Sequence, residues 1–424
     1  MAATHHSWNR WWIVFASILG LIVGQGSINV FAAGVFLKPV AQELGFGRGE
    51  ISSAIGLSSV VTALMIPFFG RLVDRFGVRP MLLGSIALFA CATAALSLLT
   101  ASTTMLLLLF AISGVMSVGQ TPTAYCKVIT EWFDRQRGLA LGLALAGVGL
   151  GTALIPQISN ALIGNFGWRM GYVGLGVTIL VLAFLPVALF VREHPRAEAA
   201  RASHHAAREI SSLPGIGFAE AIRTWRYWAM MLTFFFAATT INGTLIHVVP
   251  LLTDRGIPVG VAIGALSAAG LALIGGRVVA GYFIDKIFAP YIALIFLISP
   301  MVGIAILATG MASPLIGTVL LGLGIGAEID LMSFIISRYF GVRFFGSLHG
   351  FMFGPVLLGN AVGASILGWC FQLMHSYTPG FALFEVLLAI ACVLIMTLGR
   401  YRYPAVPEPV EGEITSLQAR PVRH

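Results

Sequence analysis

Charged residues and cysteines are scarce in this sequence. Asp, Glu, Lys and Arg make up 10% of the 424 residues, whereas a soluble protein carries about 25%, so the composition excludes a large soluble domain. The four cysteines, Cys91, Cys126, Cys370 and Cys392, show no C-x-x-C spacing. We therefore expect them to be small packing residues and to form neither a metal site nor a redox pair.

Catalytic and nucleotide-binding motifs are missing as well. The sequence contains no H-E-x-x-H, G-x-S-x-G or Walker motif. Gly-rich stretches at 147–151 and 322–326 superficially resemble phosphate loops, but both lie inside apolar runs, where small residues at helix crossings explain them better. We expect neither an enzyme nor an ATP-driven pump, and no cofactor.

Long apolar runs fill nearly the whole chain. Apolar residues make up 58% of it. An uncharged apolar run of about 20 residues indicates a spanning helix, because backbone polar groups need partners inside hydrocarbon. The runs predict an all-α membrane protein with twelve transmembrane helices. The expected spans are 11–37, 50–70, 80–100, 103–126, 138–163, 170–191, 226–252, 258–282, 290–310, 314–337, 346–371 and 379–399.

The basic residues are distributed by topology. With the N-terminus inside, 20 of the 25 Lys and Arg residues fall in the tails and inner loops. Four fall in the opposite loops, Lys38, Arg48, Arg169 and Arg255, and Arg277 lies inside a span. This asymmetry follows the positive-inside rule and predicts a multi-pass membrane protein with both termini cytoplasmic. The net charge of +8 does not indicate nucleic-acid binding, because no basic stripe with interleaved aromatic residues occurs.

The chain divides into two halves that echo each other. One long polar stretch separates six spans from six, and the pattern G-x-x-x-D-[RK] follows both span two, at Gly70–Arg75, and span eight, at Gly281–Lys286. Internal repeats of this kind are common in secondary carriers. We expect two pseudo-symmetric six-helix bundles at 1–191 and 226–400, a cytoplasmic linker at 192–225 and a disordered cytoplasmic tail at 401–424.

The stretch after span two resembles the signature of a known family. G-R-L-V-D-R-F-G-V-R at 70–79 is similar to G-x-L-x-D-R-x-G-R-R of the major facilitator superfamily, and the two-half layout extends the resemblance over the whole chain. In that family the motif forms a cytoplasmic gate latch. The alternative is a charge cluster that only orients the loop. The resemblance implies gating roles for Gly70, Asp74, Arg75, Arg79, Asp285 and Lys286.

Other stretches resemble a narrower group. F-G-R-G-E-I-S at 46–52, W-F and R-G-L-A-L-G within 132–142, and G-W-R at 167–169 are similar to bacterial relatives of the monocarboxylate transporters and oxalate/formate antiporters. The resemblance implies an organic-anion substrate and a location in a bacterial inner membrane. Leu273 and Phe31 stand where some relatives carry polar residues, so the proton-linked site of those relatives does not carry over in detail.

Arg277 is the first candidate for the substrate site. It lies eight residues before Asp285, about 12 Å from the cytoplasmic helix end and near mid-membrane. Arginine stays charged, and its planar fork fits a carboxylate with two hydrogen bonds. The pattern R-x-x-x-G at 277–281 also resembles span eight of the monocarboxylate transporter family, where the arginine binds the substrate carboxylate. The alternative is an arginine that pairs with a buried acid to hold helices together.

Lys127 on span four has a similar depth, since it lies eight residues before Arg135. It either contacts the anion or snorkels toward the cytoplasm. Tyr125 is a further substrate candidate, although it lies about 200° away from Lys127 around the helix.

Glu328 and Asp330 on span ten are candidates for proton coupling, together with His247 on span seven. Ionisable residues inside the membrane are functional candidates by default. One acid can pair with Arg277 or Lys127, and one can carry the coupling proton; the sequence does not assign these roles. His247 is either a proton relay or a residue that caps or bridges helices.

Three polar residues complete the predicted substrate site. Gln25 and Asn29 on span one are four residues apart and share a helix face. Asn242 occupies a broadly corresponding place on span seven.

These observations favour a secondary active transporter of a mono- or dicarboxylate, working by proton-coupled symport and alternating access. Its expected partners are the small organic acid, protons and the lipid bilayer, and we expect a functional monomer. An anion antiporter or an efflux carrier for amphipathic compounds is the alternative, and a non-transporting membrane sensor is a remote one.

Overall fold

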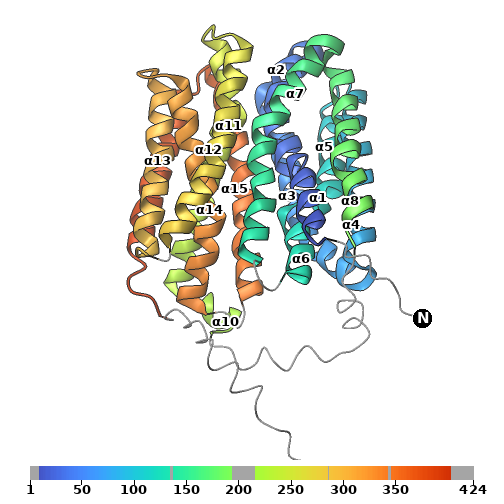
Figure 1. Cartoon of the computed structure of the whole chain (residues 1–424). Helices are drawn as coiled ribbons and strands as arrows, with labels where there is room; N and C mark the ends of the chain where they lie inside the picture. Colours follow the sequence, from blue (N-terminus) through green and yellow to red (C-terminus); the bar gives the residue numbers. More distant parts are fainter. Residues whose placement is uncertain (1–8, 134–136, 193–214, 285, 342–344, 403–424) are drawn as a thin grey trace, which may run out of the picture.

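The computed structural model describes residues 9–133, 137–192, 215–284, 286–341 and 345–402. Nearly all of the described chain is helical (Figure 1). Within these ranges the β-type pairing is a single isolated bridge between Gly215 and Gly341.

Eleven helical segments of the described chain are long and apolar enough to cross a membrane. One of them, Leu139–Phe190, has 52 residues, which corresponds to about 78 Å of helix and exceeds twice the hydrocarbon thickness. At Gly167 the backbone leaves the helical region, with φ 78° and ψ 166°, a conformation that glycine adopts readily. This segment is therefore two crossings joined by a tight turn, and the prediction of twelve spans is confirmed.

The first half of the molecule contains the elements up to residue 190. They are α1 (Trp11–Ile22), η1 (Ser27–Ala32), α2 (Ala33–Leu44), α3 (Arg48–Phe76), α4 (Val78–Ala95), η2 (Leu96–Leu98), α5 (Thr103–Met116), η3 (Ser117–Gln120), α6 (Pro122–Trp132), α7 (Arg137–Ile179), η4 (Leu180–Phe184) and α8 (Leu185–Phe190).

The second half contains the remaining elements, beginning with a short helix that precedes its first span. They are α10 (Phe218–Ala221), α11 (Trp225–Asp254), α12 (Val259–Ile284), α13 (Ala289–Thr309), α14 (Pro314–Phe340), α15 (Phe345–Met374) and α16 (Thr378–Met396).

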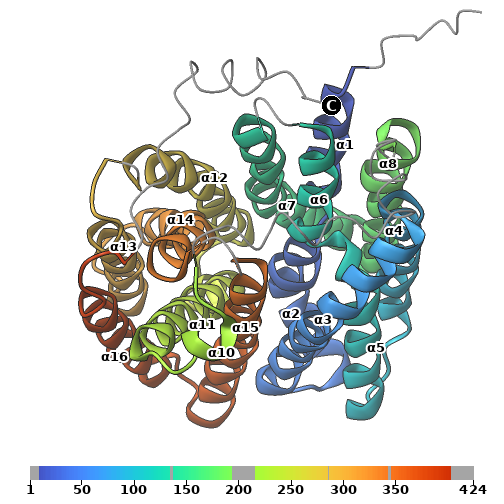
Figure 2. The same cartoon turned by 90° about the horizontal axis from the view of Figure 1, so that it is seen from below.

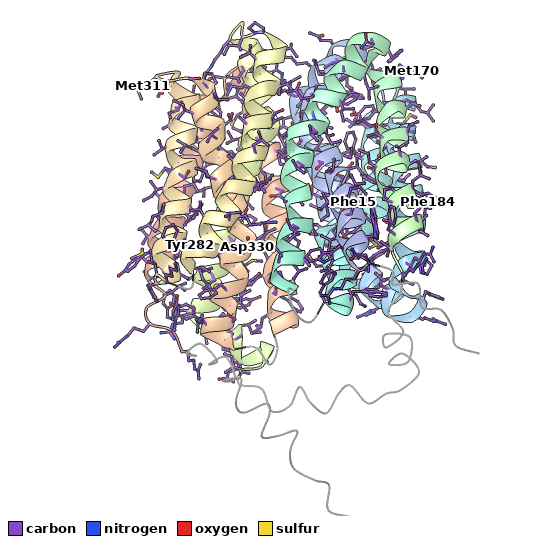
Figure 3. The ribbon with its side chains drawn as sticks, in the orientation of Figure 1. Phe15, Met170, Phe184, Tyr282, Met311 and Asp330 are labelled. Atoms are coloured by element: carbon purple, nitrogen blue, oxygen red, sulfur yellow. The ribbon has the colours of Figure 1, made fainter. Side chains whose placement is uncertain are left out.

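The two halves stand side by side as separate helix bundles (Figure 2). Extensive contacts between them are made by α2 with α11, α3 with α15, and α7 with α12. We call the end of the molecule that carries Met170 and Met311 the upper face, and the end that carries α10 the lower face (Figures 1 and 3). Asp330 and Tyr282 lie toward the lower face (Figure 3).

Glycines allow the helices of the two halves to touch. A Cβ atom at Gly149 of α7 would lie 2.7 Å from the carbonyl oxygen of Gly270 on α12, and one at Gly56 of α3 would lie 2.9 Å from the carbonyl oxygen of Ala361 on α15. Both distances are shorter than real Cβ contacts, so a larger residue would force the helices apart. The expectation that the Gly-rich stretches mark helix crossings is confirmed.

Candidate functional site

The crossing of α12 and α14 forms the centre of the candidate site. A Cβ atom at Gly322 or Gly326 of α14 would overlap the carbonyl oxygens of Ala269 and Leu273 on α12. Gly276 of α12 is packed in the same way against Leu323 of α14. The two backbones therefore run in direct contact along this stretch, as small residues permit inside membranes.

The crossing brings Arg277 and Asp330 together. Arg277 is one turn beyond Leu273, and Asp330 is one turn beyond Gly326, so both side chains continue from the contact on the same faces. Arg277 Nε lies 3.1 Å from Asp330 Oδ2, and the side chains are 13% and 31% exposed. The acid of span ten that pairs with Arg277 is thus Asp330.

Arg277 keeps unused hydrogen-bonding capacity beside this ion pair. Its Nε and Nη1 atoms are buried and, among the described residues, have no partner with hydrogen-bond geometry. The contact with Asp330 is therefore an ion pair in which the N–H is not aimed at the oxygen. Buried donors without acceptors are costly, so this guanidinium is suited to an additional acceptor.

A polar strip continues from Asp330 along α14. Ser333, one turn further toward the lower face, donates to the carbonyl oxygen of Ile329 at 2.8 Å. Its hydroxyl also lies 3.0 Å from Nε2 of His349 on α15. This strip gives the ion pair a hydrophilic connection toward the lower face.

Helix α6 of the first half carries Cys126 and Lys127. Cys126 lies within electrostatic reach of Arg277 and Asp330, so α6 and the α12–α14 crossing approach each other between the halves. The next residue, Lys127, lines a small cavity of about 80 Å³ between α3 and α6, together with Thr121 and Thr123. Lys127 and both threonines therefore line a cavity inside the first half, between α3 and the segment that joins η3 to α6.

Two spans of the first half are interrupted near the membrane centre. Span one breaks at Val23–Gly24, between α1 and the π-helical η1, and span four breaks at Thr121, between η3 and α6. The breaks are adjacent, since a Cβ atom at Gly24 would lie 3.1 Å from the carbonyl oxygen of Gln120. Discontinuous helices are typical of transporter binding sites, and the N-terminal end of α6 adds a partial positive charge.

Gln25 and Asn29 lie directly after the break in span one. Both are buried, at 8% and 2% exposure. The Ser113 hydroxyl donates to Asn29 Oδ1 at 2.9 Å, while Asn29 Nδ2 is buried with no hydrogen-bond partner among the described residues. These amides belong to the interior of the first half and do not touch the Arg277–Asp330 pair.

Glu328 points away from the ion pair. It lies in a mostly apolar pocket between α11, α13 and α14. The pocket is lined by Thr233 and by apolar residues that include Phe234 and Phe296. Its Oε1 atom is buried and has no hydrogen-bond partner among the described residues, and the Thr233 hydroxyl is already donated to Ala229. The two acids of span ten therefore occupy different environments on one helix.

Tyr125 and Asn242 are also kept out of the site. Tyr125 is fully buried, packs beneath Gly20 of α1 and donates to Gln120 Oε1 at 3.0 Å. The Asn242 amide donates to the carbonyl oxygen of Ala238 on its own helix at 3.3 Å. Neither of these hydrogen bonds involves Arg277.

His247 lies in the closure of the upper face, where the two halves meet. Its Nε2 atom is 3.3 Å from the Ser52 hydroxyl on α3 and 3.0 Å from the carbonyl oxygen of Ala364 on α15. Beside it, Trp369 donates to the Ser53 hydroxyl at 3.0 Å. These contacts place His247 on the α3–α11–α15 interface and apart from the acids of α14.

Asp254, which we did not single out in the sequence, joins the two halves by ion pairs. It ends α11, and its Oδ1 atom lies 2.7 Å from Lys38 Nζ of α2 and accepts from Arg48 Nη2 of α3 at 2.9 Å. Arg48 Nη1 donates to the other carboxylate oxygen and to the Tyr377 hydroxyl. Its guanidinium also stacks 3.8 Å above the Phe371 ring. Burial raises the pKa of Tyr377 to about 12, so the phenol stays neutral and Asp254 is the anion of this cluster.

The signal for Asp254 was present in the sequence. It is an acid at the outer end of span seven, and the outer loops hold few cations to pair with it. The pairing itself could not be predicted, because Asp254 lies more than 200 residues from Lys38 and Arg48 along the chain.

The predicted lower-face latch is only partly described. Gly70 and Arg75 are exposed, Arg79 Nη2 donates to the carbonyl oxygen of Ala188 at 2.8 Å, and Lys286 Nζ lies 3.5 Å above the Tyr282 ring. The side chain of Asp74 and the whole of Asp285 lie outside the described residues, so the latch stays a prediction.

Comparisons with known proteins identify the family. Residues 18–352 match the Major Facilitator Superfamily. The chain is 27% identical to the uncharacterized transporter YcxA of Bacillus subtilis, covering 90% of this chain and 94% of that one. It is 28% identical to the oxalate:formate antiporter of Oxalobacter formigenes over 66% of this chain and 64% of that one. It is 24% identical to monocarboxylate transporter 13 of Bos taurus over 92% and 89%.

The fold agrees with this match. A bacterial homologue of the human lysosomal transporter Spinster, solved in an inward-facing and occupied conformation, superposes with a TM-score of 0.68 over 94% of this chain and 97% of that chain, at 18% identity. The protein belongs to the Major Facilitator Superfamily and is a multi-pass membrane transporter. Its resemblance to the monocarboxylate transporter and oxalate/formate antiporter group is confirmed.

Proposed function

We propose that the protein is a secondary active carrier for a small organic carboxylate, coupled to protons in symport. The observation that carries this proposal is the Arg277 side chain, whose buried Nη1 atom has no hydrogen-bond partner among the described residues, beside an ion pair with Asp330. A carboxylate supplies two acceptor oxygens in the geometry of the guanidinium fork. The names of the relatives, a monocarboxylate transporter and an oxalate:formate antiporter, support the same substrate class.

Asp330 acts in this proposal as the internal counterion of the empty carrier. An arginine left alone inside the membrane costs several kcal/mol or more, and the Asp330 carboxylate removes that cost when no substrate is bound. The substrate carboxylate then shares Arg277 with Asp330, and Lys127 of α6 in the first half balances the added negative charge. Closing both halves around the anion brings the two cations toward it.

The coupling proton is assigned in the proposal to span ten. Asp330 lies beside a guanidinium that favours its charged form, whereas Glu328 lies in an apolar pocket without a charged partner among the described residues. An unpaired carboxylate is costly in such a pocket, and a protonated carboxyl group avoids that cost. We therefore favour Glu328 as the proton carrier. His247, which lies in the upper closure, is then a residue of the gate.

The orientation belongs to the same proposal. We infer from the distribution of Lys and Arg that the lower face is cytoplasmic and that both termini lie there. The bacterial relatives support a bacterial inner membrane. The segment boundaries are those predicted above, with bundles at 1–191 and 226–400. The described state, with the upper face closed by Asp254, then corresponds to a carrier closed toward the outside.

Exchange is the second candidate, because one relative is named an antiporter. Uptake into liposomes tests both candidates, using oxalate, formate, L-lactate and benzoate as probes. Symport predicts that an inward proton gradient drives accumulation of at least one of them into empty vesicles. Exchange predicts uptake only when a carboxylate is preloaded.

Arg277→Lys is the variant that tests the site. It keeps the charge but loses the planar fork, so at least one charge-assisted hydrogen bond, worth about 1.5–3 kcal/mol, is lost. We expect at least about a tenfold fall in transport efficiency with an unchanged elution profile and thermal midpoint. Arg169→Lys is the matched control, because Arg169 lies on the upper face and pairs with Glu43 within one half. Wild-type transport in Arg277→Lys would exclude Arg277 from the site.

A further inference from the structure

A crevice opens between the two halves near the upper face. It has a volume of about 330 Å³ and is walled by α2 and α7 of the first half and by α11 and α12 of the second. Its polar lining consists of Lys38, Gln42, Asn160 and Thr253. The volume lies within the range of about 300–1,000 Å³ that is usual for small-molecule pockets, and the site is separate from the one around Arg277.

Lys38 is the charged group of this crevice. Its side chain is 27% exposed, and its Nζ atom lies 2.7 Å from Asp254 Oδ1. An ammonium group has three donors, and the described residues supply Lys38 with this one ionic partner. Lys38 therefore has spare donors that face a cavity of small-molecule size.

Two other cations on this face, Arg169 and Arg255, contact residues of their own halves. Arg169 pairs with Glu43 and donates to the carbonyl oxygens of Ser97 and Leu99. Arg255 donates to the carbonyl oxygens of Leu307 and Ala308. Lys38 and Arg48 differ, because their carboxylate partner belongs to the opposite half of the molecule.

Asp254 presents to Lys38 the same chemical group as an organic acid. Arg48 holds this carboxylate through two hydrogen bonds, so Asp254 stays anchored when Lys38 turns away. A carboxylate in the crevice would compete with Asp254 for Lys38. It would thereby weaken one of the two ion pairs that close the upper face.

We propose that this crevice is an access site for the transported carboxylate, with Lys38 as its anion contact and Asp254 as a tethered competitor. Occupation of the crevice loosens the closure between α2 and α11 and so favours opening of the upper face. The identity of the ligand as the transported acid rests on the function proposed above, whereas the anion site itself does not.

Two substitutions with opposite expected effects test the proposal. Uptake of oxalate, formate, L-lactate and benzoate is measured in right-side-out and inverted membrane vesicles. Lys38→Gln removes the anion contact, and we expect the KM for uptake from the upper face to rise about fivefold or more. Asp254→Asn removes the competitor, and we expect the same KM to fall. The KM for uptake from the lower face stays within twofold in both variants.

If the Lys38–Asp254 ion pair only holds the upper face closed, a different result is expected. Removing either partner of this ion pair would then favour the open upper face, so both substitutions would shift the upper-face KM in the same direction. This result would overturn the proposal. Glu43→Gln serves as the control, because it breaks an ion pair on the same face within one half. It should leave both KM values unchanged.

A binding measurement keeps the test independent of transport. In the Arg277→Lys background we expect benzoate to raise the thermal midpoint of the purified protein through the crevice, and Lys38→Gln to remove this stabilisation. Stabilisation that survives Lys38→Gln would overturn the crevice site. If the wild-type protein transports none of the four acids, the proposed function fails, and this binding result alone decides the inference.

Discussion

The charged residues of the two halves lie in different environments. The second half carries the half-buried ion pair of Arg277 and Asp330, while Lys127 of the first half lines a cavity between α3 and α6. Glu328 lies only two residues from Asp330, but it faces the other side of α14. This separation allows counterion and proton carrier to be different residues of one helix.

Neutral isosteres of the two acids should therefore differ in effect. Glu328→Gln removes the proton carrier but not the substrate contact, so we expect loss of proton-driven accumulation while carboxylate counterflow between loaded vesicles remains. Asp330→Asn leaves Arg277 without its counterion, and we expect both activities to fall. Proton-driven accumulation by Glu328→Gln at the wild-type level would contradict the assignment.

Cys126 provides a reporter of site occupancy without any substitution. Because it lies within electrostatic reach of Arg277 and Asp330, a bound carboxylate should shield it. We expect saturating substrate to slow its alkylation by N-ethylmaleimide severalfold, as followed by mass spectrometry of the intact protein and its peptides. Cys91, which is exposed on α4, serves as the internal control and should react at an unchanged rate.

At this scale the sequence predicted which residue types matter better than where they point. Arg277 could be found because an arginine in an apolar run has few structural uses. The orientation of Tyr125 could not, since its packing beneath Gly20 depends on how α1 and α6 cross. The partner of Asp254 likewise depends on the docking of two halves that are distant in sequence.

Among the elements, the α12–α14 crossing controls the geometry of the site. Gly322 and Gly326 bring the two backbones together, and Arg277 and Asp330 follow one turn beyond the contact. The Gly-rich stretch of span ten indicated a close helix crossing. It could not indicate the partner helix, because glycine has no side chain and any helix can pack closely against it.

Gly326→Ala should damage both stability and the site. The added Cβ atom would overlap the carbonyl oxygen of Leu273, and overpacking of this kind costs about 1–3 kcal/mol. We expect a lower thermal midpoint and weaker transport, because the shift separates Arg277 from Asp330. Gly275→Ala on α12 is the matched control, since a Cβ atom there meets nothing within 4 Å. An equal effect of both substitutions would contradict the role of the crossing.

Breaks within spans were harder to predict than the spans themselves. Hydropathy reveals length, so the twelve crossings could be counted, and even the turn at Gly167 falls between two predicted spans. The interruptions at Gly24 and Thr121 fall in short polar stretches within longer apolar runs, G-Q-G-S-I-N at 24–29 and G-Q-T-P-T at 119–123. A hydropathy average over about 20 residues does not register such short stretches, although Pro122 at the start of α6 is a local helix-start signal.

For the whole molecule, the decisive feature is that the halves are joined near the upper face. The hydrogen bonds of Gly49 with Gln372 and of Ser53 with Trp369 lie there, as do the ion pairs of Asp254. In a carrier that works by alternating access, these contacts must separate in each cycle. The two-half layout was visible in the repeated motif, whereas the conformational state is not a property of sequence.

A disulfide across this closure should arrest transport. A Cβ atom at Gly56 would lie 3.1 Å from Ala361 Cβ across the α3–α15 interface, close to the separation of about 3.5–4.5 Å found in disulfides. Gly56→Cys with Ala361→Cys, in a background in which the native cysteines are replaced, crowds the Ala361 carbonyl oxygen, so uptake by the reduced double variant is the reference. Oxidation should stop that uptake, and reduction should restore it. The control is Gly380→Cys paired with native Cys370, at a Cβ separation of 3.7 Å within the second half. Because that bond does not cross between the halves, oxidation should leave its transport intact. Full transport by the oxidised Gly56–Ala361 variant would show that the upper closure does not open during the cycle.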